Sequence, residues 1–340
     1  MKKLLVLFLT VCLLSALAAC GSTPASNNPA DTPLPANPSA GSQESEGKSS
    51  LESEAETLAN TLPGIDRAGN EIAIPKEIHK IVSLSPGVTE LLCDLGLSGQ
   101  IICVDPDSLE YIADLSADTA VCNPLEPDIP KLFTLSPDII FTGTRLDSAG
   151  ASLYKSAEEA GICVAEIPPS HTIGNIEDDI QFVCDCVGKT MEGETIVAEM
   201  EIDLQKIAST GRTISDPKTV MLEFSGLPSI QSFGTGVYLN EMLELIGAEN
   251  ALAGEIGWVT LDEEQALEAD PDVILTAAAG RDTDAVAEIL NRSGWENTTA
   301  VQNLEVYAVD RTRCLFPNQH IIEALHEIAK TVYPQVYNDL

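Results

Sequence analysis

Short apolar runs alternate with helical segments along the first part of the folded region, and this alternation predicts its fold. The apolar runs that favour strands are residues 81–84, 101–104, 139–141 and 163–165. Breaks such as Ser85-Pro86-Gly87 separate these runs from segments with helical spacing. Strands that alternate with helices form a parallel sheet that helices cover on both faces. We therefore expect an α/β lobe over residues 61–170.

A different pattern covers residues 171–211, which contain few helix breakers beyond Gly188 and Gly193. Apolar residues recur there at helical spacing, at Ile176, Ile180, Val183, Val187, Ile196, Met200, Leu204 and Ile207. This spacing predicts either one long interlobe helix or two abutting helices.

Strand and helix alternate again after Pro217, which predicts a second α/β lobe over residues 212–340. Strands are expected at 220–224, 273–275 and 306–309, and helices at 239–246, 263–269, 286–290 and 321–332. One element occurs in both lobes, because residues 135–142 parallel residues 269–276, each with Pro-Asp before an apolar strand. The predicted fold class is α/β, with two lobes of parallel sheet, a long helix joining them and a ligand cleft between them.

The N-terminal residues have the pattern of an export signal. Two lysines precede a mostly apolar run, and the small residues of Leu17-Ala18-Ala19 precede Cys20. These are the parts of a secretory signal, and small residues before a cysteine resemble a bacterial lipoprotein signal. We expect residues 1–19 to be removed and the Cys20 thiol to carry a lipid. The alternative is an ordinary secretory signal with an accidental cysteine.

Residues 20–60 are rich in Ser, Pro, Asn, Ala and Glu and contain no aromatic residue. Such a segment cannot bury enough apolar surface to offset the entropy of ordering it. We expect it to be a semi-extended tether that holds the folded lobes away from a membrane surface.

The chain is strongly acidic, with 53 Asp and Glu against 18 Lys and Arg and a formal net charge of −35. This charge argues against nucleic-acid binding and against direct association with anionic lipid surfaces. Beyond Cys12 and Cys20, the seven remaining cysteines form no CxxC pair, so a zinc or iron–sulfur framework is not expected. We expect buried free thiols, and a disulfide between distant cysteines is the alternative.

No sequence motif for catalysis is present. The chain has no GxSxG elbow, no GxxxxGK[ST] loop, no HExxH and no EF-hand loop. We therefore expect no catalytic residue, no metal site and no resident cofactor. An extracytoplasmic hydrolase on a similar two-lobed scaffold is a competing class of function, and an adhesion or structural lipoprotein without a cleft is a third.

Binding is better supported than catalysis, because parallel strands present their C-terminal ends to a shared crevice where ligands collect. Basic residues are scarce, so an arginine that follows a predicted strand is informative. Arg145 follows the strand at 139–141, Arg281 follows that at 273–275, and Arg311 and Arg313 follow that at 306–309. These residues are candidates for holding carboxylates or phosphates of a ligand, although solvated surface positions are an equal alternative for each.

Aromatic residues on loops are the second set of candidates. Tyr111 follows the second strand, Tyr238 follows the strand at 220–224, and Trp258 lies in a predicted loop before the helix at 263–269. A flat, rigid apolar side chain on a loop suits a large planar ligand. We assign Trp258 to the cleft rather than to the core, and Trp295 to the core.

Several motifs together resemble a known family. The segment 80–86, Lys-Ile-Val-Ser-Leu-Ser-Pro, followed by Thr-Glu-Leu-Leu at 89–92 and Leu-Gly-Leu at 95–97, resembles the opening of the substrate-binding proteins of ABC importers for iron complexes and cobalamin. Residues 135–140 and 258–275 are similar to its later landmarks. The resemblance covers about residues 65–335, nearly the whole folded part.

The resemblance implies two Rossmann-like lobes, a receptor that is not an enzyme, and delivery of a metal chelate to a permease dimer with its ATPase. The ligand would be cobalamin, haem or a ferric siderophore, and the acidic chain favours a corrinoid or another weakly anionic chelate. Members of the family dock through one glutamate per lobe. Glu264, beside Glu263, stands at the second-lobe position. Pro130 occupies the first-lobe position, which leaves Asp128 and Glu126 nearby as candidates.

The same reasoning places the protein at the extracytoplasmic face of the cell membrane, held there by its lipid. We expect a monomer that binds no nucleic acid. The sequence does not identify which chelate is bound.

Overall fold

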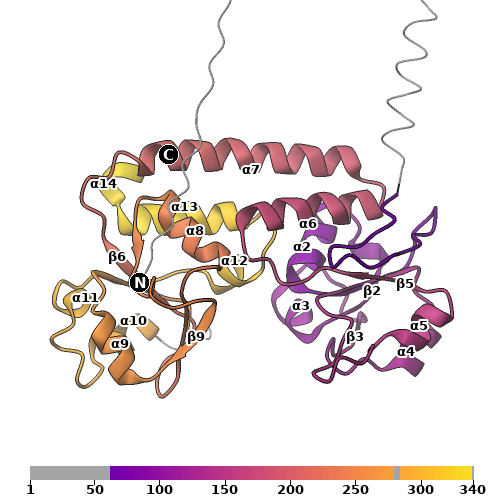
Figure 1. The fold of residues 1–340 in the computed structure, drawn as a ribbon, viewed down its shortest axis with the longest axis horizontal. Helices are drawn as coiled ribbons and strands as arrows, with labels where there is room; N and C mark the ends of the chain where they lie inside the picture. The colour runs from indigo at the N-terminus through magenta and orange to yellow at the C-terminus, as the bar shows by residue number, and fades with distance from the viewer. Residues whose placement is uncertain (1–61, 279–283, 339–340) are drawn as a thin grey trace, which may run out of the picture. The chain divides into compact units, whose positions relative to one another are not determined.

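The computed structural model describes residues 62–278 and 284–338, all of which belong to one compact unit. No helix in these two ranges is long and apolar enough to cross a membrane. Two parallel sheets form the cores of two lobes, and long helices connect them (Figure 1). The α/β fold with two lobes of parallel sheet, expected from the sequence, is confirmed.

The sheet of the N-terminal lobe has five parallel strands in the order β3-β2-β1-β4-β5. Their bounds are β1 Ile81–Leu84, β2 Ile101–Val104, β3 Ala120–Val121, β4 Ile139–Thr142 and β5 Cys163–Glu166. The central strands β1 and β4 are fully buried, as parallel strands between two helical layers must be. The helices around this sheet are α2 Pro86–Asp94, the 3₁₀ helix Ser98–Gln100, α3 Pro106–Tyr111, α4 Ile129–Leu135 and α5 Lys155–Glu159.

The C-terminal lobe has a four-stranded parallel sheet in the order β11-β10-β6-β8. Its strands are β6 Thr219–Glu223, β8 Glu249–Asn250, β10 Val273–Thr276 and β11 Val306–Ala308. The helices of this lobe are α8 Tyr238–Leu245, α9 Glu263–Ala269, α10 Ala285–Leu290, α11 Thr299–Gln302, α12 Arg311–Leu315, α13 Ile321–Val332 and α14 Pro334–Tyr337.

An antiparallel ribbon in the C-terminal lobe was not expected from the sequence. It pairs β7 Ile230–Phe233 with β9 Trp258–Leu261, and Phe233 is opposite Trp258. Trp258 therefore begins a strand, and the loop expected at this position is wrong. The sequence pattern did not predict this strand, because it is only four residues long, follows glycines and exposes two of its side chains.

The repeated Pro-Asp element has the same structural role in both lobes. Each copy follows a helix that ends in a left-handed residue, Ser136 in one lobe and Asp270 in the other. The Asp138 carboxylate accepts hydrogen bonds from the backbone amides of His79 and Lys80, just before β1. The Asp272 carboxylate accepts one from the amide of Thr219, at the start of β6. Each aspartate thus ties the start of its own strand to the start of the central neighbouring strand, at the end of the sheet opposite the crevice.

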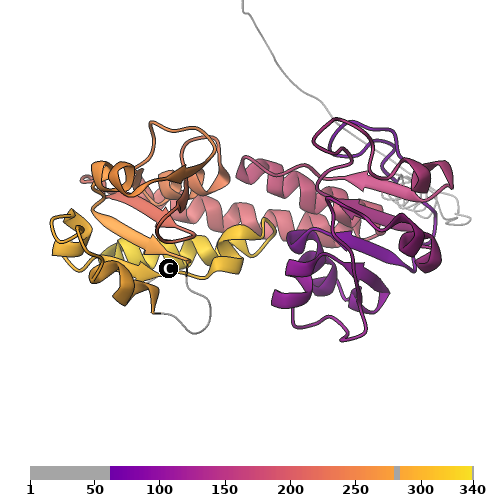
Figure 2. The same cartoon turned by 90° about the horizontal axis from the view of Figure 1, so that it is seen from below.

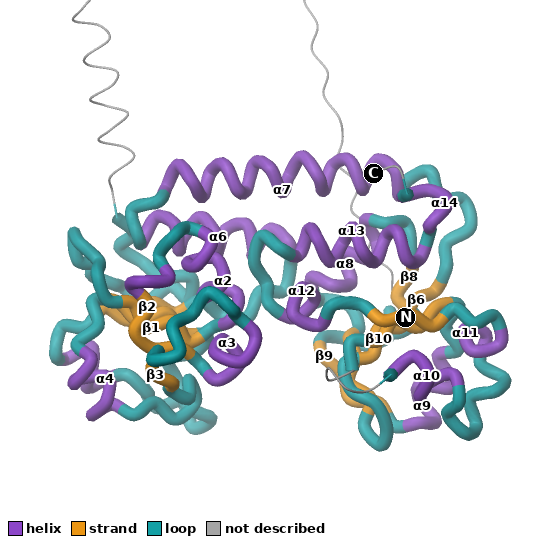
Figure 3. Tube along the Cα trace, turned by 180° about the vertical axis from the view of Figure 1, so that it is seen from behind, coloured by secondary structure: helices purple, strands orange, loops and turns teal. Residues whose placement is uncertain are grey.

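Two antiparallel helices occupy the interlobe segment, α6 Ile173–Cys186 and α7 Thr190–Gly211 (Figures 1 and 2). The chain reverses at Gly188, whose positive φ of 72° is a conformation that favours glycine. With 22 residues, α7 is about 33 Å long and reaches from one lobe to the other. The tube in Figure 3 shows α13 running beneath it.

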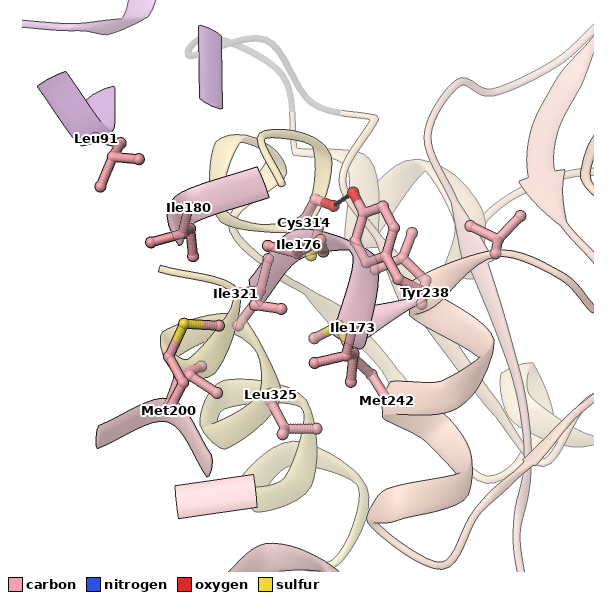
Figure 4. Close-up of a cluster of buried hydrophobic side chains, with 14 of the residues drawn as sticks. Leu91, Ile173, Ile176, Ile180, Met200, Tyr238, Met242, Cys314, Ile321 and Leu325 are labelled. Carbon is pink, nitrogen blue, oxygen red and sulfur yellow. Dashed lines mark hydrogen bonds between the residues drawn. The ribbon is translucent and has the colours of Figure 1, made fainter. Parts of the chain in front are cut away.

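One hydrophobic core runs through both lobes instead of stopping at a domain boundary. It joins Leu91 of α2 and Ile176 of α6 to Met242 of α8 and Leu325 of α13 (Figure 4). The helices at the centre of the molecule therefore belong to both lobes at once, and separating the lobes exposes apolar surface to water.

All seven cysteines in the described ranges are free thiols. Six of them are buried, and Cys93 is partly exposed. Burial raises the pKa of Cys93 and of Cys163 to about 11, so these two thiols are protonated and unreactive at neutral pH. This agrees with the expectation of buried free thiols.

The end of α7 touches the C-terminal lobe backbone to backbone. A Cβ atom on Gly211 would lie 2.1 Å from the carbonyl oxygen of Leu245 and 2.9 Å from the amide nitrogen of Gly247. Gly247 in turn has a φ of +78°, and a Cβ there would lie 2.5 Å from the carbonyl oxygen of Gly211. Only two glycines permit this crossing.

We predict that Gly211→Ala lowers the free energy of unfolding by about 1–3 kcal/mol, because the added methyl group forces two backbones apart. Urea unfolding followed by circular dichroism measures the change. Gly174→Ala is the matched control, since it is also helical but its Cβ would meet nothing closer than 3.9 Å. The packing argument fails if the two variants are equally stable.

Candidate ligand-binding cleft

Three adjoining pockets lie where the two lobes face each other, and we call them together the interlobe cleft. The first has a volume of about 280 Å³, the second about 320 Å³ and the third about 350 Å³. Leu315 lines all three, Trp258 lines the first and second, and Pro86 lines the first and third. The cleft is therefore one continuous site with three compartments, of the size that small-molecule sites have.

The N-terminal lobe contributes the ends of its parallel strands to the first pocket. Ser85 to Val88 follow β1, Gly143 follows β4, and residues 167–170 follow β5. This is the edge at which ligands of parallel α/β sheets bind. Ser85 precedes α2, and its hydroxyl makes no capping hydrogen bond to that helix.

Trp258 is the principal aromatic residue of the cleft. Its side chain is 52% exposed. Phe224 and Phe233 pack edge-on against the indole, with ring centroids 5.6 Å and 6.1 Å away. The two phenylalanines hold the ring in one orientation, so it presents a rigid apolar surface to the first and second pockets.

Asp179 is the carboxylate in the wall of the first pocket. It accepts hydrogen bonds from Nε of Arg67 at 2.6 Å and from the hydroxyl of Ser170 at 2.8 Å. Burial raises the pKa of the Asp179 carboxyl, although the bonds from Arg67 and Ser170 act in the opposite direction. The described residues of the N-terminal lobe that line this pocket are mostly apolar and include no basic side chain.

The two tyrosines predicted for the cleft have different environments. Tyr238 begins α8 and is 3% exposed, and its hydroxyl donates to the carbonyl oxygen of Cys314 at 2.5 Å (Figure 4). It lies in the floor of the first pocket, and its polar group is already used. Tyr111 is half-exposed in the third pocket and packs edge-on against Phe316 of the other lobe.

The arginines predicted to bind the ligand are for the most part engaged elsewhere. Arg145 forms ion pairs with Asp66 and Glu158 and lines none of the three pockets. This position does not support a role in ligand binding, because the buried carboxylate of Asp66 holds the Arg145 side chain within the N-terminal lobe. Arg281 lies outside the described residues.

Arg313 belongs instead to a set of polar contacts between the lobes, which we call the interlobe clasp. Nη1 of Arg313 is 2.8 Å from Glu90 of α2, and the amide of Asn318 donates to the same carboxylate at 2.7 Å. Nε2 of His320 lies 2.7 Å from Asp94, also on α2. The clasp thus consists of two carboxylates of the N-terminal lobe and four side chains of the C-terminal lobe, since the amide of Gln319 also donates to Asp94 at 2.5 Å.

His320 contacts a carboxylate at each ring nitrogen, since Nδ1 lies 2.7 Å from Glu323. Beside the clasp, a Cβ on Gly87 would lie 2.6 Å from the carbonyl oxygen of Pro317, so the backbones of the two lobes also meet directly here. The clasp and this contact form one border of the cleft.

The acidic residues predicted to dock on a permease lie at or next to the helices α4 and α9. These two helices are on the same side of the molecule, away from α7 (Figures 1 and 3). Glu264 is exposed in the first turn of α9, whereas Glu263 accepts a hydrogen bond from Nε1 of the buried Trp295. Asp128 caps α4 by accepting from the amide of Lys131, and Glu126 is exposed in the preceding loop.

Of the polar residues that line the second pocket, Arg311 was among the arginines that the sequence offered as ligand-binding candidates. Ser232 was not singled out, because it lies in the short strand β7, which the sequence did not predict. The clasp was also missed, because its partners are more than 220 positions apart in the chain. Among the described residues, no group of three or more His, Cys, Asp or Glu side chains is placed to hold a metal ion.

Comparisons with known proteins agree with this geometry. The model of the periplasmic binding protein family matches residues 81–312, which include both parallel sheets and most of the residues that line the cleft. The chain is 30% identical over 288 residues to the uncharacterized ABC transporter substrate-binding lipoprotein YvrC of Bacillus subtilis, covering 81% of this chain and 87% of that one. The chain belongs to the periplasmic binding protein family. It is accordingly a substrate-binding protein of the kind that works with ABC importers.

Solved structures show that the fold is that of two-lobed binding proteins. The molybdate-bound MolA of Haemophilus influenzae superposes with a TM-score of 0.70 at 21% identity, covering 82% of this chain and 93% of that one. The vitamin B12-binding protein BtuF of Vibrio cholerae superposes with a TM-score of 0.60 at 22% identity, covering 76% and 97%. The family consists of extracytoplasmic solute-binding proteins, not of enzymes.

Proposed function

We propose that this protein is a lipid-anchored receptor that captures a metal chelate in the interlobe cleft and delivers it to an ABC permease. The observation that carries the proposal is Trp258, an indole half-exposed in the cleft and braced by two phenylalanines. A large planar or bulky apolar ligand buries such a surface, whereas a small ion leaves it in water.

The charge of the cleft favours a corrinoid or another weakly anionic chelate. One basic side chain, Arg311, lines the described part of the three pockets, and the acidic Asp107 and Asp179 line them as well. A ligand with several negative charges, such as a ferric catecholate, requires more positive charge than this to offset its desolvation. Similarity to a vitamin B12-binding protein supports the same choice.

The competing hypothesis of an extracytoplasmic enzyme has less support. No histidine or cysteine is present among the described residues that line the cleft. Ser170 donates to Asp179, but a carboxylate held by Arg67 is a poor base for activating a hydroxyl. We propose that the protein acts by binding alone, as a monomer and without a resident cofactor.

Tryptophan fluorescence tests the proposal directly, because one of the two tryptophans lies in the cleft and the other, Trp295, is fully buried. We expect titration with cyanocobalamin, haemin or a set of ferric siderophores to quench the Trp258 emission. We expect Trp258→Ala to weaken binding by about 1–3 kcal/mol for whichever probe the wild-type protein binds. The melting temperature should not fall.

Phe133→Ala is the control for removing an exposed aromatic residue, since Phe133 lies on α4 and lines none of the three pockets. Isothermal titration calorimetry measures the affinities independently of the fluorescence signal. The receptor hypothesis is abandoned if none of the probes binds the wild-type protein. If Trp258→Ala binds the probe as tightly as the wild type, the role of Trp258 in binding is wrong, but the receptor hypothesis stands.

The membrane anchor is a separate proposal and concerns residues outside the described ranges. Its support is the signal pattern that ends at Cys20, the polar segment 20–60 that follows, and a lipoprotein among the relatives. The lipid would hold the protein at the extracytoplasmic face of the cell membrane, and the polar segment would let the lobes reach the permease.

We predict that Cys20→Ala abolishes incorporation of radiolabelled palmitate and moves the protein from the membrane fraction to the soluble extracytoplasmic fraction. Cys12→Ala, a change inside the predicted signal, is the control and leaves both unchanged. Retention of Cys20→Ala in the membrane fraction contradicts the anchor.

Docking on the permease is proposed for the acidic side chains of α9 and α4. Glu264 is the main candidate in the C-terminal lobe, with Glu263 beside it, and Asp128 and Glu126 are the candidates in the N-terminal lobe. Glu264 is exposed and forms no ion pair with a described residue, so it is available to a basic partner. Glu263 and Asp128 already hold Trp295 and the amide of Lys131, which makes them weaker candidates.

We predict that Glu264→Lys lowers permease-stimulated ATP hydrolysis and uptake by about tenfold, because the reversed charge repels the basic partner. Affinity for the probe and the melting temperature stay within error of the wild type. Glu199→Lys, an equal change of charge on an exposed position of α7, is the control. Undiminished uptake with Glu264→Lys refutes this docking site.

A further inference from the structure

The second pocket of the cleft has polar side chains in its lining. It is lined by Arg311 and Ser232, with Gln231 and Thr260 on the adjoining strands. Trp258 lines both this pocket and the first pocket. The polar side chains are therefore placed to receive a polar group that projects from a ligand held against the indole.

Arg311 differs from all the other described arginines except the exposed Arg212 in forming no ion pair with a described carboxylate. Arg67, Arg145, Arg292 and Arg313 all form ion pairs with carboxylates, as expected in a chain with 53 acidic residues. No carboxylate of the described residues lies within ion-pair distance of Arg311. Its charge is left uncompensated inside the cleft, where the low polarity of the surroundings strengthens attraction to an anion.

The guanidinium is also held in place. Nη1 donates to the carbonyl oxygens of Phe224 at 2.7 Å and Ala277 at 3.3 Å, both at the ends of central strands. No described residue accepts a hydrogen bond from Nε or Nη2, which together form the edge that binds a carboxylate or phosphate through two parallel bonds. One side of the group is fixed by the backbone, and the other is available to a ligand.

Ser232 provides an independent observation that points to a polar ligand group in this pocket. The residue is 1% exposed, and its Oγ atom has no hydrogen-bond partner among the described residues. A buried hydroxyl without a partner destabilises the protein by roughly 1–3 kcal/mol. A ligand oxygen in the second pocket would supply the missing partner.

We infer that Arg311 and Ser232 form a subsite for one oxyanion group of the ligand, a carboxylate or a phosphate. This inference rests on the proposed function and adds to it that the ligand carries such a group at its edge. Arg311 offers two donors and one positive charge, and Ser232 offers a third donor. A single negative charge is matched here, whereas a polyanion is not.

Paired probes with and without an oxyanion test the subsite, and the comparison of variants separates the oxyanion from the rest of the nucleotide loop that cobinamide also lacks. Haemin carries two carboxylates, and its dimethyl ester carries none. Cyanocobalamin carries a phosphodiester, and cobinamide lacks it. Calorimetric titration of the wild-type protein shows which pair binds, and therefore whether the group is a carboxylate or a phosphate. We expect the acid-bearing member to bind more tightly than its partner.

Arg311→Gln is expected to weaken binding of the acid-bearing probe by about tenfold to a hundredfold, the usual effect of losing charge-assisted hydrogen bonds. It should leave the ester or cobinamide unchanged. Ser232→Ala is expected to produce a smaller loss with the same selectivity. Arg212→Gln is the matched control, because Arg212 is exposed and lies outside the cleft.

Arg311→Lys is the control for a folding defect, because lysine keeps the positive charge but cannot bind an oxyanion through two parallel hydrogen bonds. It should bind the acid-bearing probe with intermediate affinity. Equal loss of both members of a pair in Arg311→Gln would show a structural role and overturn the subsite, as would unchanged affinity for both. If the wild-type protein binds neither these four probes nor the ferric siderophores, the proposed function itself fails.

Discussion

The crossing of α7 over the C-terminal lobe is the constraint on which the arrangement of the two lobes depends. Gly211 and Gly247 allow two backbones to touch where any larger residue would hold them apart. At the border of the cleft, Gly87 and Pro317 bring the lobes into a second backbone contact, which the interlobe clasp surrounds. Between these contacts the hydrophobic core is continuous, so the lobes share one set of buried side chains. The width of the cleft is set by these contacts and not by a flexible linker.

Much of the fold follows from local sequence, and the parts that do not have a physical explanation. Buried parallel strands such as β1 and β4 are short apolar runs with clear turn signals, and the repeated Pro-Asp element marks the same junction in each lobe. The ribbon of β7 and β9 has no such signal, because half of its residues face solvent or the cleft. For residues 171–211 the sequence allowed either one long helix or two abutting helices. The positive φ of Gly188 identifies the point where the chain reverses between two helices.

The site was predicted less well than the fold, for an electrostatic reason. Position after a strand puts an arginine near the cleft, but the partner that it finds determines where its charge is used. Arg313 and Arg145 have carboxylates within reach from other elements, 223 and 79 positions away in the chain, whereas Arg311 has two carbonyl oxygens. Such partners are invisible without the three-dimensional structure. Trp258 could be selected because aromatic residues are scarce in this chain, at 4% of the sequence.

The fixed spacing of the lobes has a kinetic consequence. A receptor that alternates between open and closed forms loses apparent affinity in proportion to the time that it spends in the form unable to bind. A receptor with tied lobes loses little in this way, and its association rate is set mainly by diffusion and orientation of the ligand. The residence time of the ligand then becomes the quantity that limits delivery. It follows that the work of unloading must come from the transporter, whose ATPase supplies energy that a passively opening receptor would not require.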